Sequence, residues 1–150
     1  MDVSALANGD VRFLFDRQRF QQVLKNVVSN SIKFTEARNN SEISIVARLQ
    51  QEITQENNVL EVTVTDSGIG ILENELKSIF TAFFQTTDIK SQLMNPNGNG
   101  LGLNISKQIC TNLGGGITVS SMYGVGSSFT FSMQVFNVMF NQIRKTKSAK

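Results

Sequence analysis

Three polar side chains recur along one predicted helix at a spacing that suits ligand binding. Asn26, Asn30 and Lys33 stand at positions i, i+4 and i+7, which aligns them in a single stripe. An amide oxygen is a hard, neutral ligand suited to Mg²⁺, and a lysine one turn further on suits a phosphate. Asparagine is a poor helix former, so two of them within a helix need a reason. Taken alone, the stripe is better explained as a solvated helix face.

A second candidate group is the aspartate in the run VTVTDSGIGI. Asp66 shares its strand parity with the apolar residues before it, so its carboxylate ends the apolar face of the strand. A carboxylate at the rim of a core can accept a hydrogen bond from a purine amino group. Gly68 and Gly70 would let the backbone turn sharply and approach a flat ring. The alternative is a simple turn capped by the aspartate side chain.

An aromatic run and a glycine-rich run enclose a segment without periodicity. The run IFTAFFQ at 79–85 is explained by core packing, and its functional use would be to anchor the base of a moving lid. Residues 85–100 contain the only proline and end in NGNG, which predicts a mobile loop. The run GNGLGL at 98–103 precedes a predicted helix, where backbone N–H groups can bind phosphate. No strand closely precedes it, which argues against a dinucleotide-binding fold.

The elements that position these groups alternate between strand and helix patterns. Asp16 is a plausible N-cap for the helix that carries the polar stripe. Strands are predicted at 11–15, 43–49, 59–65, 117–121 and 128–135, and further helices at about 73–84 and from Gly102 to the glycines at 114–116. This pattern predicts an α+β domain: a two-layer α/β sandwich with one mixed sheet and one layer of about three helices.

Composition narrows the class of protein. The 150 residues suffice for one domain, and a net charge of +2 gives no reason to expect nucleic acid as a partner. The single cysteine, Cys110, excludes an internal disulfide and any cysteine-cluster metal site. We find no signal peptide and no apolar run long enough to span a membrane, and therefore expect a cytoplasmic domain whose parent protein is free to carry a membrane anchor.

The motifs together, in their order, resemble the ATP-binding catalytic domain of sensor histidine kinases. The run from Asp16 to Thr35 resembles the N box of that family, DSGIG the first glycine box, IFTAFFQ the phenylalanine box and GNGLGL the second glycine box. The run GGGITVSSMYGVGSSFTFSM resembles the closing strands. The resemblance covers residues 11–135, with 136–150 as a basic C-terminal tail or linker, and it implies the Bergerat ATP-binding fold shared with gyrase, the mismatch-repair ATPases and the large heat-shock chaperone.

The resemblance also implies roles for individual residues. Asn30 would bind Mg²⁺, with Asn26 as its polar partner and Lys33 reaching phosphate. Asp66 would accept from the adenine amino group, and residues 86–99 would form the ATP lid. The implied nucleotide-binding set is completed by Phe34, Gly68, Gly70, Gly98, Asn99, Gly100, Leu101 and Gly102. In this chain the lid segment contains Lys90 as its one cation, where many family members carry an arginine.

The function that the resemblance implies is transfer of the ATP γ-phosphate to a histidine on another domain. This chain contains no histidine, so the acceptor would lie on a separate dimerization domain, with a response regulator or receiver domain downstream. Two alternatives stay open. One is direct ATP hydrolysis, although Asn26 stands where the gyrase-like branch places a glutamate base and an amide cannot act as a general base. The other is a non-catalytic nucleotide-sensing module.

Overall fold

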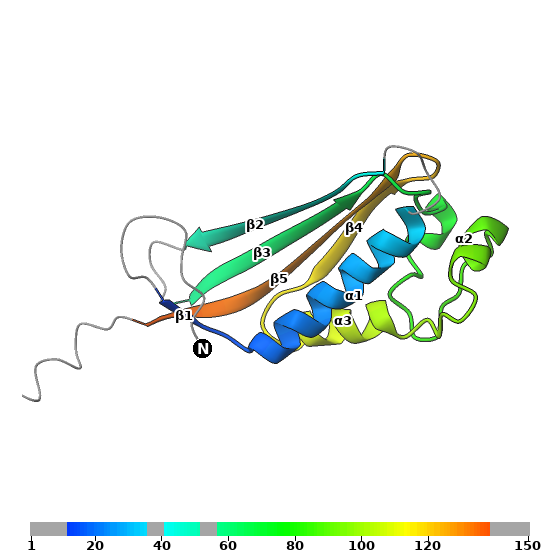
Figure 1. The fold of residues 1–150 in the computed structure, drawn as a ribbon. Helices are drawn as coiled ribbons and strands as arrows, with labels where there is room; N and C mark the ends of the chain where they lie inside the picture. Colours follow the sequence, from blue (N-terminus) through cyan, green and yellow to red (C-terminus); the bar gives the residue numbers. More distant parts are fainter. Residues whose placement is uncertain (1–11, 36–40, 52–56, 139–150) are drawn as a thin grey trace, which may run out of the picture.

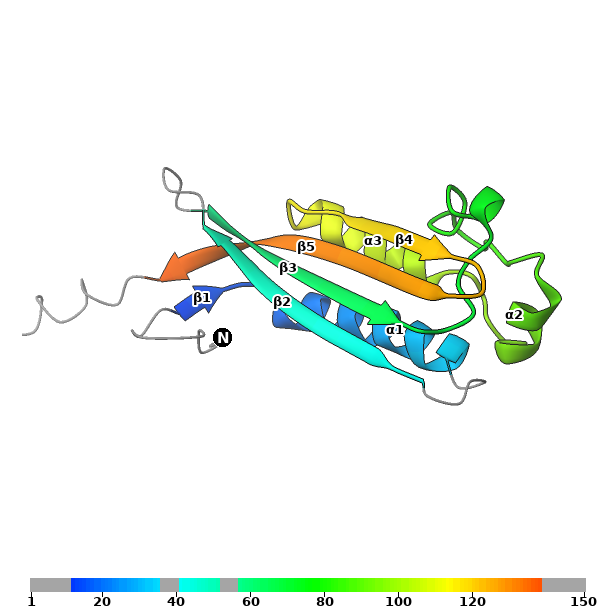
Figure 2. The same ribbon diagram turned by 90° about the horizontal axis from the view of Figure 1, so that it is seen from above.

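The strands form one continuous sheet. The computed structural model describes residues 12–35, 41–51 and 57–138. The strands are β1 (Arg12–Leu14), β2 (Ile43–Gln51), β3 (Asn57–Asp66), β4 (Ile117–Met122) and β5 (Gly126–Val138). They follow the order β1-β5-β3-β2, and β4 also pairs with β5 (Figure 2). We expected a mixed sheet. All the pairings between the described strands are antiparallel.

Two long helices, α1 (Arg17–Thr35) and α3 (Gly102–Asn112), cover one face of this sheet (Figure 1). The predicted two-layer sandwich is therefore confirmed. Asp16 caps α1 as expected, because its Oδ1 accepts a hydrogen bond from the Arg19 amide at 3.0 Å. None of the helices in the described part of the chain is long and apolar enough to cross a membrane.

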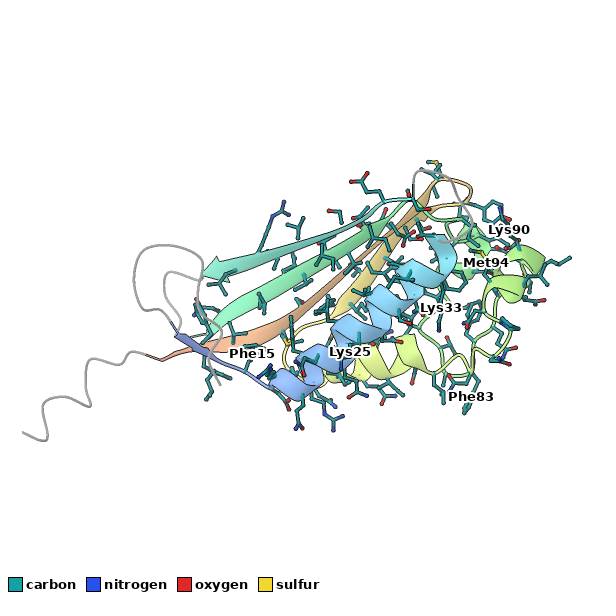
Figure 3. The ribbon with its side chains drawn as sticks, viewed as in Figure 1. Phe15, Lys25, Lys33, Phe83, Lys90 and Met94 are labelled. Carbon is teal, nitrogen blue, oxygen red and sulfur yellow. The ribbon has the colours of Figure 1, made fainter. Side chains whose placement is uncertain are left out.

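The helix predicted at about 73–84 is wrong. A short 3₁₀ turn, η1 (Glu73–Glu75), is followed by further turns, with Ser78 donating to the Glu75 carbonyl and Thr81 to the Ser78 carbonyl. Phe83 has φ of 60°, in the left-handed region, which a continuing helix cannot contain. Its side chain was expected to point inward, but it is 73% exposed and projects from the molecule (Figure 3).

The segment expected to lack regular structure contains a short helix, α2 (Ile89–Met94). Its N-cap is Asp88, whose carboxylate accepts from the Ser91 amide at 2.8 Å and from the Ser91 hydroxyl at 2.7 Å. The cap explains why a helix forms here without an amphipathic pattern: it satisfies amide donors that the first turn leaves unpaired. In Figure 1, α2 stands at the end of the molecule, beyond the last turn of α1.

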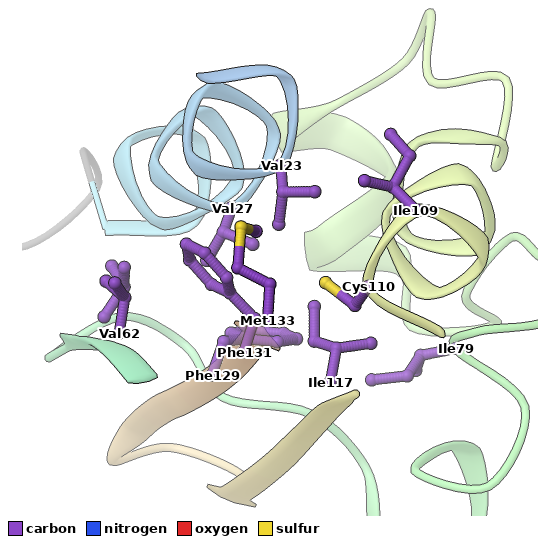
Figure 4. Close-up of a cluster of buried hydrophobic side chains, with 11 residues drawn as sticks. Val23, Val27, Val62, Ile79, Ile109, Cys110, Ile117, Phe129, Phe131 and Met133 are labelled. Carbon is purple, nitrogen blue, oxygen red and sulfur yellow. The ribbon is translucent and has the colours of Figure 1, made fainter. Parts of the chain in front are cut away.

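The core lies between the two helices and the sheet (Figure 4). Val23 and Val27 of α1 are fully buried, as is Cys110 of α3, and burial raises the pKa of the Cys110 thiol to about 11. The apolar face predicted for β5 is confirmed by four residues that are at most 5% exposed: Phe129, Phe131, Met133 and Val135. This packing fixes the ends of α1 and α3 against β3 and β5, where the polar motif residues gather.

Candidate nucleotide-binding site

A cavity of about 600 Å³ opens between the C-terminal half of α1, the turn after β3 and the segment that contains α2. Its volume is in the usual range for small-molecule sites. Most of the predicted site residues line it: Asn26, Asn30, Lys33, Phe34, Asp66, Gly70, Gly98, Asn99, Gly100 and Gly102. The two others, Gly68 and Leu101, lie outside its lining. Four motifs separated by up to about 75 residues of sequence therefore meet around one space.

The wall contributed by α1 carries the amide and lysine stripe. Asn26 donates from Nδ2 to the Ser106 hydroxyl of α3 at 2.9 Å, so its amide is fixed in orientation. Asn30 makes no side-chain hydrogen bond within the described residues and is open to the cavity. Lys33 is exposed and lies on the side of α1 that faces the lid segment (Figure 3). The stripe thus lines a cavity, and the interpretation of a plain solvated face does not hold.

Asp66 is a buried residue of the cavity lining, beside the C-terminal end of α1. The residue is 6% exposed, and its Oδ1 accepts from the amides of Gly68 at 3.0 Å and Ser127 at 3.2 Å. The bond to Gly68 is the aspartate-capped turn that we considered as an alternative, so the turn and the cavity position coexist. Because both bonds reach Oδ1, the second oxygen is left to accept a hydrogen bond from a ligand.

Two glycines are required by close approach of the backbone. Gly70 has φ of 70°, and a Cβ there would overlap the Met122 carbonyl at the end of β4. A Cβ on Gly102, at the start of α3, would overlap the amide of Asn26. Gly70 lets the chain turn close to Asp66. Gly102 lets the N-terminus of α3 approach the polar stripe of α1.

The two ends of the lid segment are joined. Gln85 donates from Nε2 to the Gly98 carbonyl at 2.9 Å. Asn104 of α3 donates from Nδ2 to the Phe80 carbonyl, also at 2.9 Å. Residues 86–97 therefore leave and return to the body of the domain at one place, as expected for a flap over a cavity.

The cavity lining also includes two acids that we did not predict, Glu75 and Asp88. Burial raises the pKa of Glu75, but hydrogen bonds from Thr86 and Thr87 outweigh it and hold the pKa below its usual value. The Ser91 hydroxyl is the main cause that lowers the pKa of Asp88. The Tyr123 hydroxyl donates to Asp88 at 2.8 Å, which raises the pKa of Tyr123. Both acids are therefore carboxylates at neutral pH.

Ser31 is another lining residue that we did not predict. It is 1% exposed, and its hydroxyl has no hydrogen-bond partner. The sequence held a weak signal, because Ser31 continues the i, i+4 stripe of Val23 and Val27, where a hydroxyl is out of place. Glu75 gave no signal of this kind, since the run ENE looks like any solvated segment.

The sequence of this domain matches one family of nucleotide-binding proteins. Residues 15–137 match the family described as histidine kinase-, DNA gyrase B-, and HSP90-like ATPase. The chain belongs to this family. Both the family resemblance and the fold expected from it are confirmed, and the domain is an ATPase-type catalytic domain of the kind found in sensor histidine kinases.

Individual relatives support this placement. The sensor protein GacS of Pseudomonas syringae pv. syringae is 40% identical over 121 residues, which are 80% of this chain and 13% of GacS. The catalytic domain of histidine kinase ThkA is 33% identical with a TM-score of 0.62, covering 85% of this chain and 74% of ThkA. Full-length ShkA in complex with AMPPNP is 27% identical with a TM-score of 0.62, covering 85% of this chain and 24% of ShkA.

The match is to one part of much longer proteins. The chain spans 6% of the hybrid signal transduction histidine kinase B of Dictyostelium discoideum and 15% of the aerobic respiration control sensor protein ArcB of Escherichia coli. The family match supports nucleotide binding by this histidine-kinase-type domain.

Proposed function

We propose that this histidine-kinase-type domain binds ATP with Mg²⁺ and positions the γ-phosphate for transfer to a histidine on a separate dimerization domain. The observation that carries the proposal is that one cavity is lined by an oriented, buried carboxylate, Asp66, and by the amide–lysine stripe of α1. A purine base suits the carboxylate, and a chain of phosphates suits the stripe. Asp66 would accept the adenine amino group, beside the turn that contains Gly68 and Gly70.

The phosphates would lie between the α1 stripe and the start of α3. Lys33 supplies a positive charge that makes no ion pair within the described part of the chain, and the amide of Asn99, which follows Gly98 in the cavity lining, provides a neutral donor. Phosphoryl transfer depends on positioning and on neutralising charge, which these groups provide. The attacking nitrogen comes from the acceptor domain, since this chain has no histidine.

The residues present fit a magnesium ion. The described residues contain no cluster of three carboxylate, histidine or cysteine side chains that could hold a metal. A metal in this cavity would therefore take most of its ligands from phosphate and water, a mode of binding that Mg²⁺ favours. Asn30 is the unpaired amide on the phosphate side and would contribute the protein oxygen. When bound, Mg²⁺ neutralises charge on the transferred group.

Hydrolysis by this domain alone should be slow. The side-chain amide of Asn26 lies against Gly102 at the start of α3, and an amide cannot remove a proton from water at neutral pH. The relatives named as sensor kinases suggest that a receiver domain or response regulator takes the phosphoryl group next, and ATP as the donor places the reaction in the cytoplasm.

The test combines this chain with a purified histidine-bearing dimerization domain from the same parent protein. With ATP labelled on the γ-phosphate and Mg²⁺, label should appear on the dimerization domain as an acid-labile, alkali-stable phosphohistidine. Label should not appear when Mg²⁺ is chelated. If the chain binds ATP tightly but never labels that domain, it is a nucleotide-binding module and the transfer proposal is wrong.

A further inference from the structure

Glu75 is a buried acid whose side-chain hydrogen bonds all come from the beginning of the lid segment. The residue is 5% exposed, at the end of η1. Its Oε1 accepts from the Thr87 amide at 2.7 Å and from the Thr87 hydroxyl at 2.8 Å, and its Oε2 accepts from the Thr86 hydroxyl at 2.7 Å. One side chain therefore holds two consecutive residues that lie 11 and 12 positions further along the chain.

Core packing does not explain a charged group at this position. Burying a carboxylate is costly unless it is paired, and none of the described residues forms an ion pair with Glu75. The cost is offset by three hydrogen bonds to a charged acceptor, which are stronger than neutral ones. An apolar residue here would pack at lower cost but would leave the start of the lid without its anchor.

The anchor continues into the lid helix. Thr86 Oγ1 accepts from the Asp88 amide at 3.1 Å, and Asp88 then caps α2 through Ser91. Asp88 also accepts from Tyr123, in the turn between β4 and β5. The direction in which α2 leaves the domain is thus set by an unbroken series of hydrogen bonds that begins at Glu75.

On its other side Glu75 is tied to the wall near Asp66. Only Leu72 separates η1 from Ile71, and the Ile71 amide donates to the Ser121 hydroxyl of β4 at 2.9 Å. That hydroxyl in turn donates to the Gly126 carbonyl at the start of β5 at 2.8 Å. The start of the lid is therefore fixed relative to the proposed purine end of the cavity, whereas its far end joins the phosphate end through Gly98–Gly102.

We propose that Glu75 is a positioning residue that orients the lid over the phosphates, and that it contributes to the binding of the terminal phosphate more than to that of the base. This inference rests on the proposed function. Glu75 acts through Thr86 and Thr87 and does not itself contact the nucleotide. The first residues of the expected lid, 86–88, are then a fixed anchor, and the moving part begins with α2.

The experiment compares Glu75→Gln with Glu73→Gln, an exposed acid in the same short turn. Glutamine keeps the shape of the side chain but replaces one acceptor oxygen with an NH₂ group that opposes a donor. Calorimetry with ADP and with a non-hydrolysable ATP analogue, both with Mg²⁺, should show a loss of at least fivefold for the ATP analogue and less than twofold for ADP. Hydrogen exchange across 86–99 should accelerate in Glu75→Gln and remain unchanged in Glu73→Gln.

A structural role alone would weaken both nucleotides together, so an equal loss for ADP and the ATP analogue would overturn the proposal. Unchanged affinities with unchanged exchange would overturn it as well. Thr87→Val gives an independent test that does not depend on the folding of Glu75→Gln, because it removes one donor without changing the size of the side chain. Like Glu75→Gln, it should weaken binding of the ATP analogue more than binding of ADP, and an equal loss for the two nucleotides would count against the proposal. If the wild-type chain bound neither nucleotide, the proposed function would fail before this inference was tested.

Discussion

The side-chain amide of Asn26 occupies the space that a side chain on Gly102 would need. A Cβ atom at position 102 would overlap Asn26 Oδ1, while Asn26 Nδ2 is bonded to Ser106 one turn further along α3. The Asn26 amide is therefore held in place by contacts with the first two turns of α3. The polar stripe of α1 and the glycine-rich start of α3, which are separate motifs in the sequence, form one structural unit in the fold.

Gly102→Ala should disrupt this unit. The added methyl group must displace Asn26 or the start of α3, and overpacking of this kind costs about 1–3 kcal/mol of stability. Nucleotide affinity should fall by roughly tenfold, because both displaced groups face the proposed phosphate end. Denaturant unfolding and calorimetry measure the two effects. Gly116→Ala is the control, since no atom lies within 4 Å of its added Cβ; if both variants behave alike, the contact with Asn26 has no special importance.

Asp66→Asn should weaken adenine nucleotides specifically. The substitution exchanges an acceptor for an amide that can also donate, and an unmatched buried polar group costs about 1–3 kcal/mol. Calorimetry should therefore show a loss of affinity for ADP of at least about fivefold, with no gain for GDP. Because Asp66 also holds the Gly68 and Ser127 amides, unfolding must be measured in parallel. Unchanged ADP affinity in a folded variant would remove Asp66 from the purine site.

Asn30→Ala should abolish the enhancement of nucleotide binding by Mg²⁺. An ion held by few protein ligands depends strongly on each of them. ADP affinity is measured with Mg²⁺ and with a chelator in wild type and variant, and we expect the ratio of the two affinities to approach one in the variant. Ser29→Ala, on an exposed position of the same helix turn, should preserve the wild-type ratio. A full metal effect in Asn30→Ala would show that the ion is held elsewhere.

Ser31→Ala and Ser106→Ala should change stability in opposite directions, although both serines are buried. Ser31 leaves an unpaired hydroxyl in the interior, so its removal should stabilise the domain by about 1 kcal/mol. Ser106 accepts from Asn26, and its removal leaves this partly buried amide without its partner, which costs about 0.5–1.5 kcal/mol. Denaturant midpoints at constant slope give both values. Loss of stability in Ser31→Ala would mean that its hydroxyl is bonded in solution, for example to an ordered water.

Stability should decrease in acid partly through Glu75 and Asp88. Both have a pKa below its ordinary value, 4.5 for Glu75 and 3.8 for Asp88, so the unfolded chain takes up protons at a pH where the folded chain does not. Their contribution is fully present above the ordinary values and is lost as the pH falls through the lowered ones. Denaturant midpoints taken from neutral pH down to about pH 3 should fall less steeply in Glu75→Gln than in wild type. A parallel fall in both proteins would show that Glu75 does not titrate with folding.

Regular elements were largely predictable because each carries a periodic signal. The strand alternation of β3 and β5 predicted the burial of Val62, Val64, Phe129 and Phe131 correctly. The segment 73–84 shows where periodicity misleads: its apolar spacing fits a helix, but the chain follows a series of turns that bury Ile79 and leave Phe83 exposed. Periodicity identified Ile79 as an inward residue, but it did not report the backbone path, which decides where Phe83 points.

By itself, the sequence determined the order of the strands and of the two long helices, the family resemblance and the motif residues that line the cavity, because these depend on local spacing and on residue type. Only the tertiary structure decided what joins the lid to the body. The bonds from Thr86 and Thr87 to Glu75 and from Tyr123 to Asp88 connect irregular segments 11 to 35 residues apart. Such contacts leave no repeating pattern in the chain, since each depends on where two separate turns place one donor and one acceptor.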